Sequence, residues 1–514
     1  MRAQVLRGCC LLMIVAGGCG DDVSSASDGT TGETSGGSTS STTVGATMDT
    51  SGATETPTTS TTDEPTTDAD GSSDGGFEPT DPECGNGFVE ADEQCDDAND
   101  DDQDGCTRAC EFQCGLQWST VTLAPTDQSQ LDARGIAETA DGDVVVVGFQ
   151  REITTDQRGN ETIENDDAAV LRLDAEGEEL WATRLGAEDE NLAVTGVAVD
   201  EAGDVYVSAT VGPLQGDDDI QVIKLSGDDG SVVWTFVQDS AVDSAEDSSF
   251  GIAMGPDGNP VATGQVRAGP GDDDIWVGKI DASTGEALWT STWSGMFSGM
   301  FSTDDGGPVA VGPDGSVYVL ASEYVDFQTQ PVTLVAFDAD GGDATLTHTP
   351  DVGPGSQDML PSDVSVTADG EVLLTFIRLL GGGDEYYVTR FDPDSGDETW
   401  RVDQLLFEQA SVVDNASSFS LVGAEGLPDS GVLVTGLLAR SEKGATWTET
   451  WVARLNDAGD IGCMFVRESP QLSLVPGSLV GRAVAASSDQ SALVAAQQIE
   501  DGAEALWVGS FRPE

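Results

Sequence analysis

The chain has 514 residues, and its 94 Asp and Glu residues against 20 Lys and Arg give a formal net charge of −74. This length permits more than one domain and a large buried core. A surface this acidic repels nucleic acid and anionic lipid headgroups, so nucleic acid is excluded as a partner, whereas calcium and cationic partners are favoured. The alternative is that the acidic residues serve solubility alone.

Residues 1–19 have the pattern of an export signal. Arg2 and Arg7 precede the short apolar run LLMIVA, which is too short to span a bilayer as a mature helix. The ending AGGC resembles bacterial lipoprotein signals, which implies acylation of Cys19 and attachment to a membrane through that lipid. Ala16 stands where that family prefers leucine, so cleavage without lipidation is the alternative. We expect an exported protein, held in the cell envelope (outer membrane or cell surface) as a lipoprotein or secreted.

Residues 20–83 form a segment rich in Ser, Thr, Gly and Asp. It contains few large apolar side chains, so it cannot bury enough surface to offset the loss of chain entropy on folding. We expect a disordered linker between the signal and the folded part of the chain.

Residues 84–114 form a compact cysteine module. Five cysteines lie close together in a chain expected to be exported, a pattern typical of a disulfide framework. The motifs CGNG, ExCDD and DGC resemble the myxobacterial cysteine-rich disulfide repeat. This resemblance implies export and disulfide bonds rather than an activity. The cysteines that match the repeat are Cys84, Cys95, Cys106 and Cys110.

The same module contains acidic residues at the spacing D-x-D-x-D-G-x5-E. These residues are Asp100, Asp102, Asp104 and Glu111, with Gly105 at the turn. In an EF-hand, these positions supply oxygen ligands to calcium. Two cysteines lie inside the loop and no amphipathic helices flank it, so two interpretations stay open: a calcium site of another kind, or an acidic solvated turn.

From residue 115 onward the sequence repeats. Glycines between two apolar runs predict tight β-hairpins, because Asp-Gly accommodates positive φ angles. The spacing of about 58 residues is typical of a four-stranded propeller blade. The turn glycines are Gly142, Gly203, Gly258, Gly315, Gly370 and Gly431.

Each repeat continues with a third apolar strand, a glycine turn and a fourth strand. One position of the fourth strand, four residues after the turn glycine, is usually tryptophan, which we expect to pack between blades. The residues at this position are Trp181, Trp234, Trp289, Leu346, Trp400 and Cys463.

The seventh repeat ends at ALWVGSFRPE without a fourth strand, and CGLQWSTVTLA, with Trp118, supplies one from the other end of the domain. Such closure removes an exposed sheet edge. We predict an all-β fold, a seven-bladed β-propeller over residues 115–514 closed by its N-terminal strand. The repeat DAAVLRLDAEGEELW resembles bacterial, quinoprotein-like propeller repeats with docking tryptophans. That architecture hosts many functions.

The longer loops of the repeats should gather on one face, opposite the short turns, and variable loops on a rigid scaffold commonly carry function. Matching acidic triplets in two neighbouring repeats lie in these loops. They suggest either a site for a divalent cation or cationic partner, or a solvated acidic rim. The residues are Asp217, Asp218, Asp219, Asp272, Asp273 and Asp274.

His348 is the only histidine, which argues against a Ser-His-Asp triad or a histidine-rich metal centre. We therefore expect no enzyme, but a propeller that presents an acidic binding face to a protein, glycan or envelope partner. One alternative is a hydrolase or lyase that uses carboxylates with shifted pKa values in an axial pocket. Another is an envelope-assembly scaffold that recognises strands through an exposed edge.

Two cysteines remain outside these assignments. Cys114 is the odd fifth member of the cysteine module, and Cys463 stands alone in the propeller. They could form a disulfide, although both lie on strands of different blades; the alternative is a buried free thiol at Cys463.

Overall fold

A computed structural model describes residues 114–513, all within the second of two compact units of the chain, Pro79–Glu514. The description omits residues 124–128, 156–160, 187–189, 214–216, 241, 243–245, 270–271, 296–303, 305, 324, 326–329, 354–357, 381–382, 411–415, 428, 443–444, 468–477, 489–490 and 501–502.

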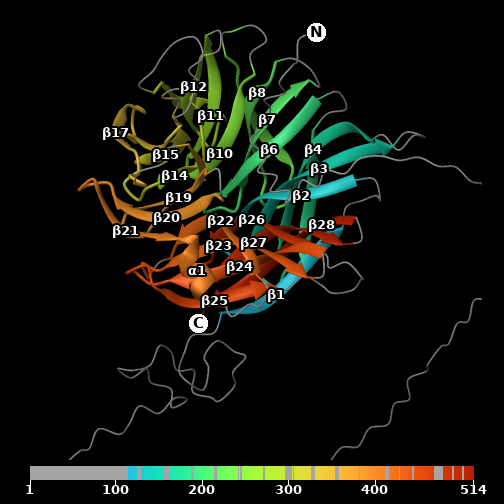
Figure 1. Cartoon of the computed structure of the whole chain (residues 1–514). Coiled ribbons are helices and arrows are strands. Elements are labelled where there is room, and N and C mark those ends of the chain that lie inside the picture. Colours follow the sequence, from blue (N-terminus) through green and yellow to red (C-terminus); the bar gives the residue numbers. More distant parts are fainter. Residues whose placement is uncertain are drawn as a thin grey trace, which may run out of the picture. The chain divides into compact units, whose positions relative to one another are not determined.

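The strands form seven four-stranded antiparallel sheets, which are the blades of a propeller (Figure 1). The first strand of each blade contacts the first strand of the next, and β26 contacts β2, so the seven first strands form a closed ring. The predicted seven-bladed, all-β architecture is confirmed.

The blades are numbered in chain order. They are blade 1, β2 (Ser129–Glu138), β3 (Val144–Thr155), β4 (Glu161–Leu173) and β5 (Glu179–Leu185); blade 2, β6 (Glu190–Val199), β7 (Val205–Pro213), β8 (Asp219–Leu225) and β9 (Val232–Gln238); blade 3, β10 (Ser248–Met254), β11 (Pro260–Gly269), β12 (Asp272–Ile280) and β13 (Ala287–Trp293); blade 4, β14 (Val309–Val311), β15 (Val317–Ser322), β16 (Val332–Phe337) and β17 (Ala344–His348); blade 5, β18 (Met359–Val366), β19 (Val372–Arg378), β20 (Glu385–Asp392) and β21 (Asp397–Asp403); blade 6, β22 (Ala416–Gly426), β23 (Val432–Glu442), β24 (Ala445–Leu455) and β25 (Ile461–Arg467); and blade 7, β26 (Ser478–Ala486), β27 (Ala492–Glu500), β28 (Ala503–Pro513) and β1 (Cys114–Leu123).

The closing strand β1 is the outer strand of blade 7. It pairs with β28 in antiparallel register from Cys114, opposite Pro513, to Leu123, opposite Ala505. The two ends of the propeller sequence therefore share one sheet, as the missing fourth strand of the last repeat predicted.

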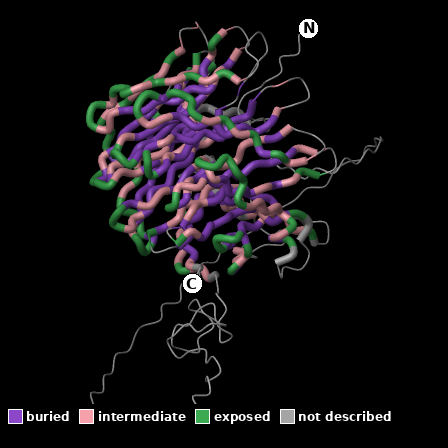
Figure 2. The backbone as a smooth tube through the Cα atoms, turned by 90° about the vertical axis from the view of Figure 1, so that its left-hand side faces the viewer, coloured by how far each residue is buried: buried purple, intermediate pink, exposed green. Residues whose placement is uncertain are grey.

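The inner strands are apolar on both sides because each blade is covered by two neighbours. In β15 and β16 every residue is buried, whereas the outer strand β9 alternates between exposed and half-buried positions. Figure 2 shows this burial along the chain, with exposed residues gathered at turns and outer strands. Each apolar cluster draws side chains from two adjacent blades, as β2 of blade 1 and β27 of blade 7 do in one of them.

A tryptophan and a cation hold most neighbouring blades together. In the joint between blades 2 and 3, Trp234 donates its Nε1–H to the backbone oxygen of Ala282 over 3.0 Å. Lys224 Nζ donates to the same oxygen over 3.2 Å. Arg172 with Trp181, Lys279 with Trp289 and Arg390 with Trp400 share carbonyls in the same way. The tryptophans thus pack between blades, as predicted.

One short helix, α1 (Gln404–Ala410), connects blade 5 to blade 6, and the repeat pattern did not predict it. Phe407 on this helix is fully buried, with its ring centre 4.7 Å from that of Trp451. None of the helices in the described part of the chain is long and apolar enough to cross a membrane.

Candidate functional site

Several predicted site residues lie outside the described part of the chain. They are the lipidation residue Cys19, the module cysteines Cys84, Cys95, Cys106 and Cys110, and the calcium candidates Asp100, Asp102, Asp104 and Glu111.

The two acidic triplets occupy matching places in blades 2 and 3, at the beginnings of β8 and β12. Each triplet is joined to the segment that leads into the next blade. Asp247 donates its backbone N–H to the backbone oxygen of Asp218 over 2.9 Å, and Asp304 does the same to Asp273 over 3.0 Å. The triplets therefore help to fix the blade joints, a role that the sequence did not reveal.

The triplet of blade 2 belongs to a larger group of carboxylates, here called the blade-2 acidic cluster. Burial, followed by the charges of Asp239 and Asp217, raises the pKa of Asp219 to about 6. Burial and the charge of Glu246 raise the pKa of Asp218. The cluster comprises Asp217, Asp218, Asp219, Asp239, Glu246 and Asp247.

Most side chains of the two acidic triplets are partly or fully buried, so they do not form a fully solvated rim. Asp217 is exposed, but Asp218, Asp219, Asp272 and Asp274 are half-buried and Asp273 is buried. Asp273 forms an ion pair with Arg267. Burial, with the charges of Asp272 and Asp273, raises the pKa of Asp274. Within the described ranges, no group of three or more His, Cys, Asp or Glu side chains is arranged to hold a metal ion.

The outer strand of blade 2, β9, exposes apolar side chains next to this cluster. Val232, Val233 and Val237 are 52%, 55% and 47% exposed. Leu180 and Leu288, 52% and 50% exposed, take the place of Val233 on the outer strands of blades 1 and 3. In each case the exposed residue directly precedes the docking tryptophan, a position that the repeat pattern did not single out.

Two acidic residues lie at the inner ends of blades 5 and 6. Asp363 on β18 accepts a hydrogen bond through Oδ2 from the backbone N–H of Ala424 on β22, over 3.2 Å. Burial raises the pKa of Asp363 to about 7. Burial and the charge of Asp363 raise the pKa of Glu425, also on β22, to about 8.

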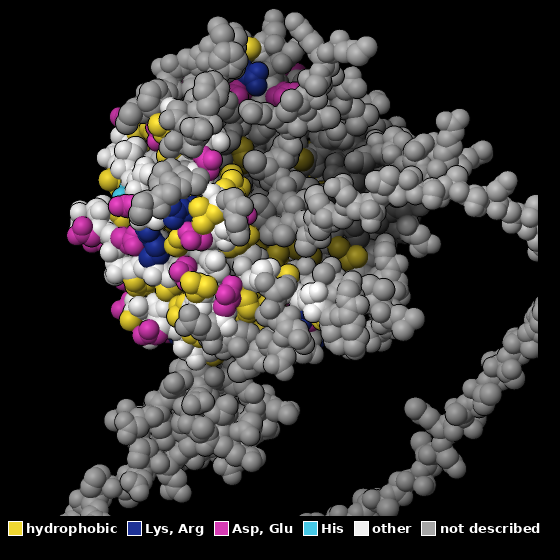
Figure 3. Space-filling model, viewed as in Figure 1, with side chains coloured by type: hydrophobic (Ala, Val, Ile, Leu, Met, Phe, Trp, Pro, Cys, Tyr) yellow, Lys and Arg dark blue, Asp and Glu magenta, His cyan; other side chains and the backbone are white. Residues whose placement is uncertain are grey.

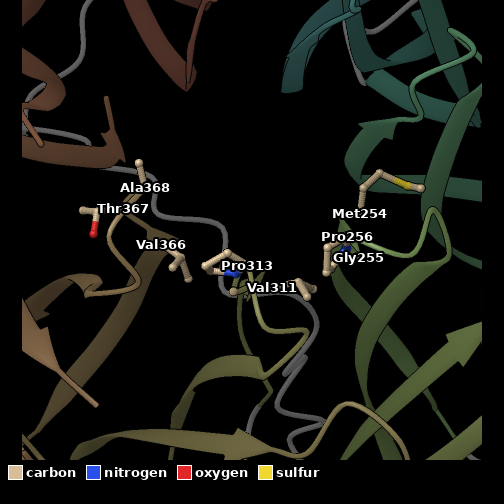
Figure 4. Close-up of a pocket in the computed structure, with 9 residues that line it drawn as sticks. Met254, Gly255, Pro256, Val311, Pro313, Val366, Thr367 and Ala368 are labelled. Atoms are coloured by element: carbon tan, nitrogen blue, oxygen red, sulfur yellow. The ribbon is translucent and has the colours of Figure 1, made fainter. Parts of the chain in front are cut away.

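A pocket of about 310 Å³ opens at the short-turn ends of three inner strands (Figure 4). Its lining is mainly apolar and includes neither Asp363 nor Glu425. It is lined by Met254, Gly255, Pro256, Val311, Gly312, Pro313, Val366, Thr367 and Ala368.

The remaining singled-out residues are His348 and Cys463. His348 lies on the outer strand β17, where burial and then the charge of Arg401 lower its pKa. Cys463 is buried and disulfide-bonded, so the interpretation as a free thiol is wrong.

The positive charges of the described residues lie largely beside carboxylates. The cations of the blade joints contact carboxylates of their own blades, as Lys224 does Asp204 over 2.8 Å. Figure 3 shows blue Lys and Arg side chains among magenta Asp and Glu on one face.

Comparison with known proteins supports the repeat type. Residues 273–512 match the family PQQ_2, described as outer membrane protein assembly factor BamB. This range runs from β12 in blade 3 to β28 in blade 7. No curated protein matches the chain.

Solved structures resemble the chain at low identity. A quinohemoprotein alcohol dehydrogenase from Comamonas testosteroni is 9% identical, with 77% of this chain and 76% of that one covered and a TM-score of 0.39. An ulvan lyase is 10% identical, with 77% and 98% covered and a TM-score of 0.44. A protein of unknown function from Dyadobacter fermentans is 10% identical, with 66% and 98% covered and a TM-score of 0.41. Likeness at this level carries no argument about function. The chain is a seven-bladed β-propeller whose repeats match the quinoprotein-like, BamB-type repeat family from blade 3 to blade 7.

Proposed function

We propose that this chain is an exported, non-enzymatic scaffold of the cell envelope that binds an extended polypeptide segment along the outer strand of blade 2. The observation that carries the proposal is the unprotected edge of β9. Among the described strands, β9 pairs only with β8, and no residue from Val232 to Gln238 is charged.

Edge strands commonly carry charges, proline or bulges that prevent pairing with another chain. Strand β9 instead carries four apolar side chains around its docking tryptophan, three of them exposed valines. Valine favours extended backbone, and the free edge offers backbone N–H and C=O groups. A partner strand would gain main-chain hydrogen bonds there and apolar contacts at alternate positions.

The acidic residues on either side of β9 favour a partner with basic residues at both ends of its binding segment. Asp228 and Asp229 precede β9 and Asp239 follows it, beside the blade-2 acidic cluster. A segment with basic residues at both ends of an apolar, extended stretch complements this arrangement. Binding should therefore weaken as salt is added, because exposed charges are screened.

The envelope location is part of the proposal. A lipid on Cys19 and the linker of residues 20–83 would hold the propeller away from a membrane surface while leaving its outer strands accessible. The match to repeats described for an outer membrane assembly factor supports this location.

The test is direct binding of a labelled synthetic peptide with alternating valine and threonine and lysines at both ends, measured by fluorescence anisotropy. The double variant Val233→Lys/Thr235→Lys places charges on β9 and should weaken binding about tenfold or more, the effect of losing about 1.4 kcal/mol. The matched control is Thr345→Lys/Thr347→Lys, at the equivalent positions of β17, and should bind like the parent chain. Equal binding by both variants, or no binding by the parent chain, would contradict the proposal.

A carboxylate-based hydrolase or lyase is the alternative, and it would depend on Asp363 and Glu425, because a raised pKa suits a general acid. The side chain of Asp363 lies against blade 6, where a Cβ added to Gly423 would come within 2.5 Å of its Oδ2. The pair thus lies in a blade joint and not in the lining of the pocket, which favours binding over catalysis.

A further inference from the structure

The blade joints follow a positional rule. The outer-strand tryptophan of one blade packs against the residue that lies four positions before the equivalent outer-strand position of the next blade. That residue is a glycine, and a Cβ added to it would lie only 2.6–3.1 Å from the indole ring. The pairs are Trp118 with Gly177, Trp181 with Gly230, Trp234 with Gly285, Trp289 with Gly342, and Trp400 with Gly459.

Applied to the joint between blades 6 and 7, the rule selects two cysteines. The tryptophan position of blade 6 is Cys463, and the residue four positions before Trp118 of blade 7 is Cys114. A side chain at the glycine position of a joint begins within contact distance of the docking side chain, so two cysteines at such a pair of positions are close enough to bond.

Three further observations agree with this pairing. Cys463 is 6% exposed and is disulfide-bonded. Its strand β25 contacts β1, whose first residue is Cys114. Leu116 and Phe465, each two residues after one of these cysteines, pack against one apolar cluster of blades 6 and 7.

We propose that Cys114 and Cys463 form a disulfide that locks the closing strand of the ring. Blade 7 has no turn between its third and fourth strands, because β28 ends at Pro513 and β1 begins at Cys114. A tryptophan in blade 6 would find no turn glycine or turn carbonyl there. The covalent bond replaces the tryptophan contact at the one joint where the chain is discontinuous.

The number of cysteines is consistent with this bond. Four module cysteines match the disulfide repeat, which leaves Cys114 as the odd one. Formation joins the two sulfurs and releases two protons and two electrons, which pass to an oxidised disulfide-exchange protein. The lock therefore closes only in an oxidising compartment. This inference does not depend on the proposed binding function.

Disulfide mapping tests the pairing. The full chain, recovered from an oxidising compartment with its thiols blocked, is digested without reduction and examined by mass spectrometry. We expect the peptide with Cys463 to be linked to the peptide with Cys114. A link from Cys463 to any of the other module cysteines would overturn the proposal.

Thermal unfolding gives an independent measure. Cys463→Ala, Cys114→Ala and the double variant should each lower the Tm by the same amount, about 4–8 °C, because each removes the same bond. The variant Cys110→Ala keeps both Cys114 and Cys463. A reductant should therefore lower its Tm, as it lowers that of the parent chain, because it breaks the Cys114–Cys463 bond. Additive losses in the double variant would show that the two cysteines do not share a bond.

Discussion

At the scale of single residues, one backbone oxygen in a blade joint accepts hydrogen bonds from two side chains. The Ala282 oxygen accepts from both Trp234 and Lys224, and Lys224 also forms an ion pair with Asp204 over 2.8 Å. Of the 20 Lys and Arg residues in the chain, four lie at such oxygens in the part that the structure describes. The cations are therefore structural parts of the ring.

The replacement Lys224→Met should destabilise the propeller by about 3 kcal/mol, because it leaves Asp204 without its cation in a largely buried joint. Trp234→Phe retains most of the packing and loses one hydrogen bond, so its cost should be about 1 kcal/mol. Denaturant unfolding of both variants measures the difference. A smaller loss for the lysine variant than for the tryptophan variant would contradict the role assigned to the cation.

The Asp363–Glu425 pair makes stability depend on pH. Because their folded pKa values are raised to about 7 and about 8, the native state binds more protons than the unfolded state between the ordinary carboxyl range and about pH 8. The free energy of unfolding contributed by the pair therefore falls as pH rises through that range. It is restored as pH falls.

The double variant Asp363→Asn/Glu425→Gln removes this dependence. It should be more stable than the parent chain at pH 8, and the advantage should shrink steadily toward pH 5. Tm values of both proteins, measured in parallel across this range, test the expectation. Parallel curves would mean that the pair does not titrate as described.

The raised pKa values of Asp363 and Glu425 could not be predicted from the sequence. Asp363 follows a break in strand register on β18, at a position where β6 has Gly196 and β22 has Gly423. Nothing distinguishes one carboxylate among 94 in the sequence. Only the aligned inner strands show that a glycine position has been replaced by an acid.

At the scale of elements, the turns could be predicted because their glycines have a physical requirement. Gly142, Gly203 and Gly258 have φ angles of +87°, +84° and +76°. In blade 6 the prediction is wrong by one residue, because Ser430 has the positive φ angle, +67°, and Gly431 does not. The segments between blades could not be predicted, since they do not repeat. Helix α1 is one of these, and Phe407 on it is buried by contact with blade 6.

Substitutions at two glycines of blade 3 allow the cost of backbone strain to be measured apart from the cost of disturbing the tryptophan contact. Gly285 and Gly258 have similar φ angles, +74° and +76°, but a Cβ on Gly285 would lie 2.8 Å from Trp234, whereas nothing lies within 4 Å of one on Gly258. Gly258→Ala should cost about 1 kcal/mol for its φ angle alone. Gly285→Ala should cost about 2 kcal/mol more, as an overpacked contact does. Equal losses in chemical unfolding would argue against the docking contact.

At the scale of the whole molecule, the predicted calcium ligands lie in the cysteine module, outside the described part of the chain. The described residues of the propeller contain no group arranged to hold a metal ion. If the acidic residues of the cysteine module hold calcium, saturable calcium binding should disappear in the variant Asp100→Ala/Asp102→Ala/Asp104→Ala. Calorimetric titration of the full chain and this variant decides the point. Calcium binding retained by the variant would mean that the site lies elsewhere, and the blade-2 acidic cluster would be the next candidate.

The closing strand β1 is synthesised long before its partner strand β28. Gln117 and Ser510, which share a hydrogen bond between β1 and β28, are 393 positions apart in the chain. At a synthesis rate of about 5–20 residues per second, β1 waits about 20–80 s for its partner strand to be made. During that interval it is an uncharged ten-residue strand without its sheet. Among the described strands, the first to be synthesised therefore pairs with the last.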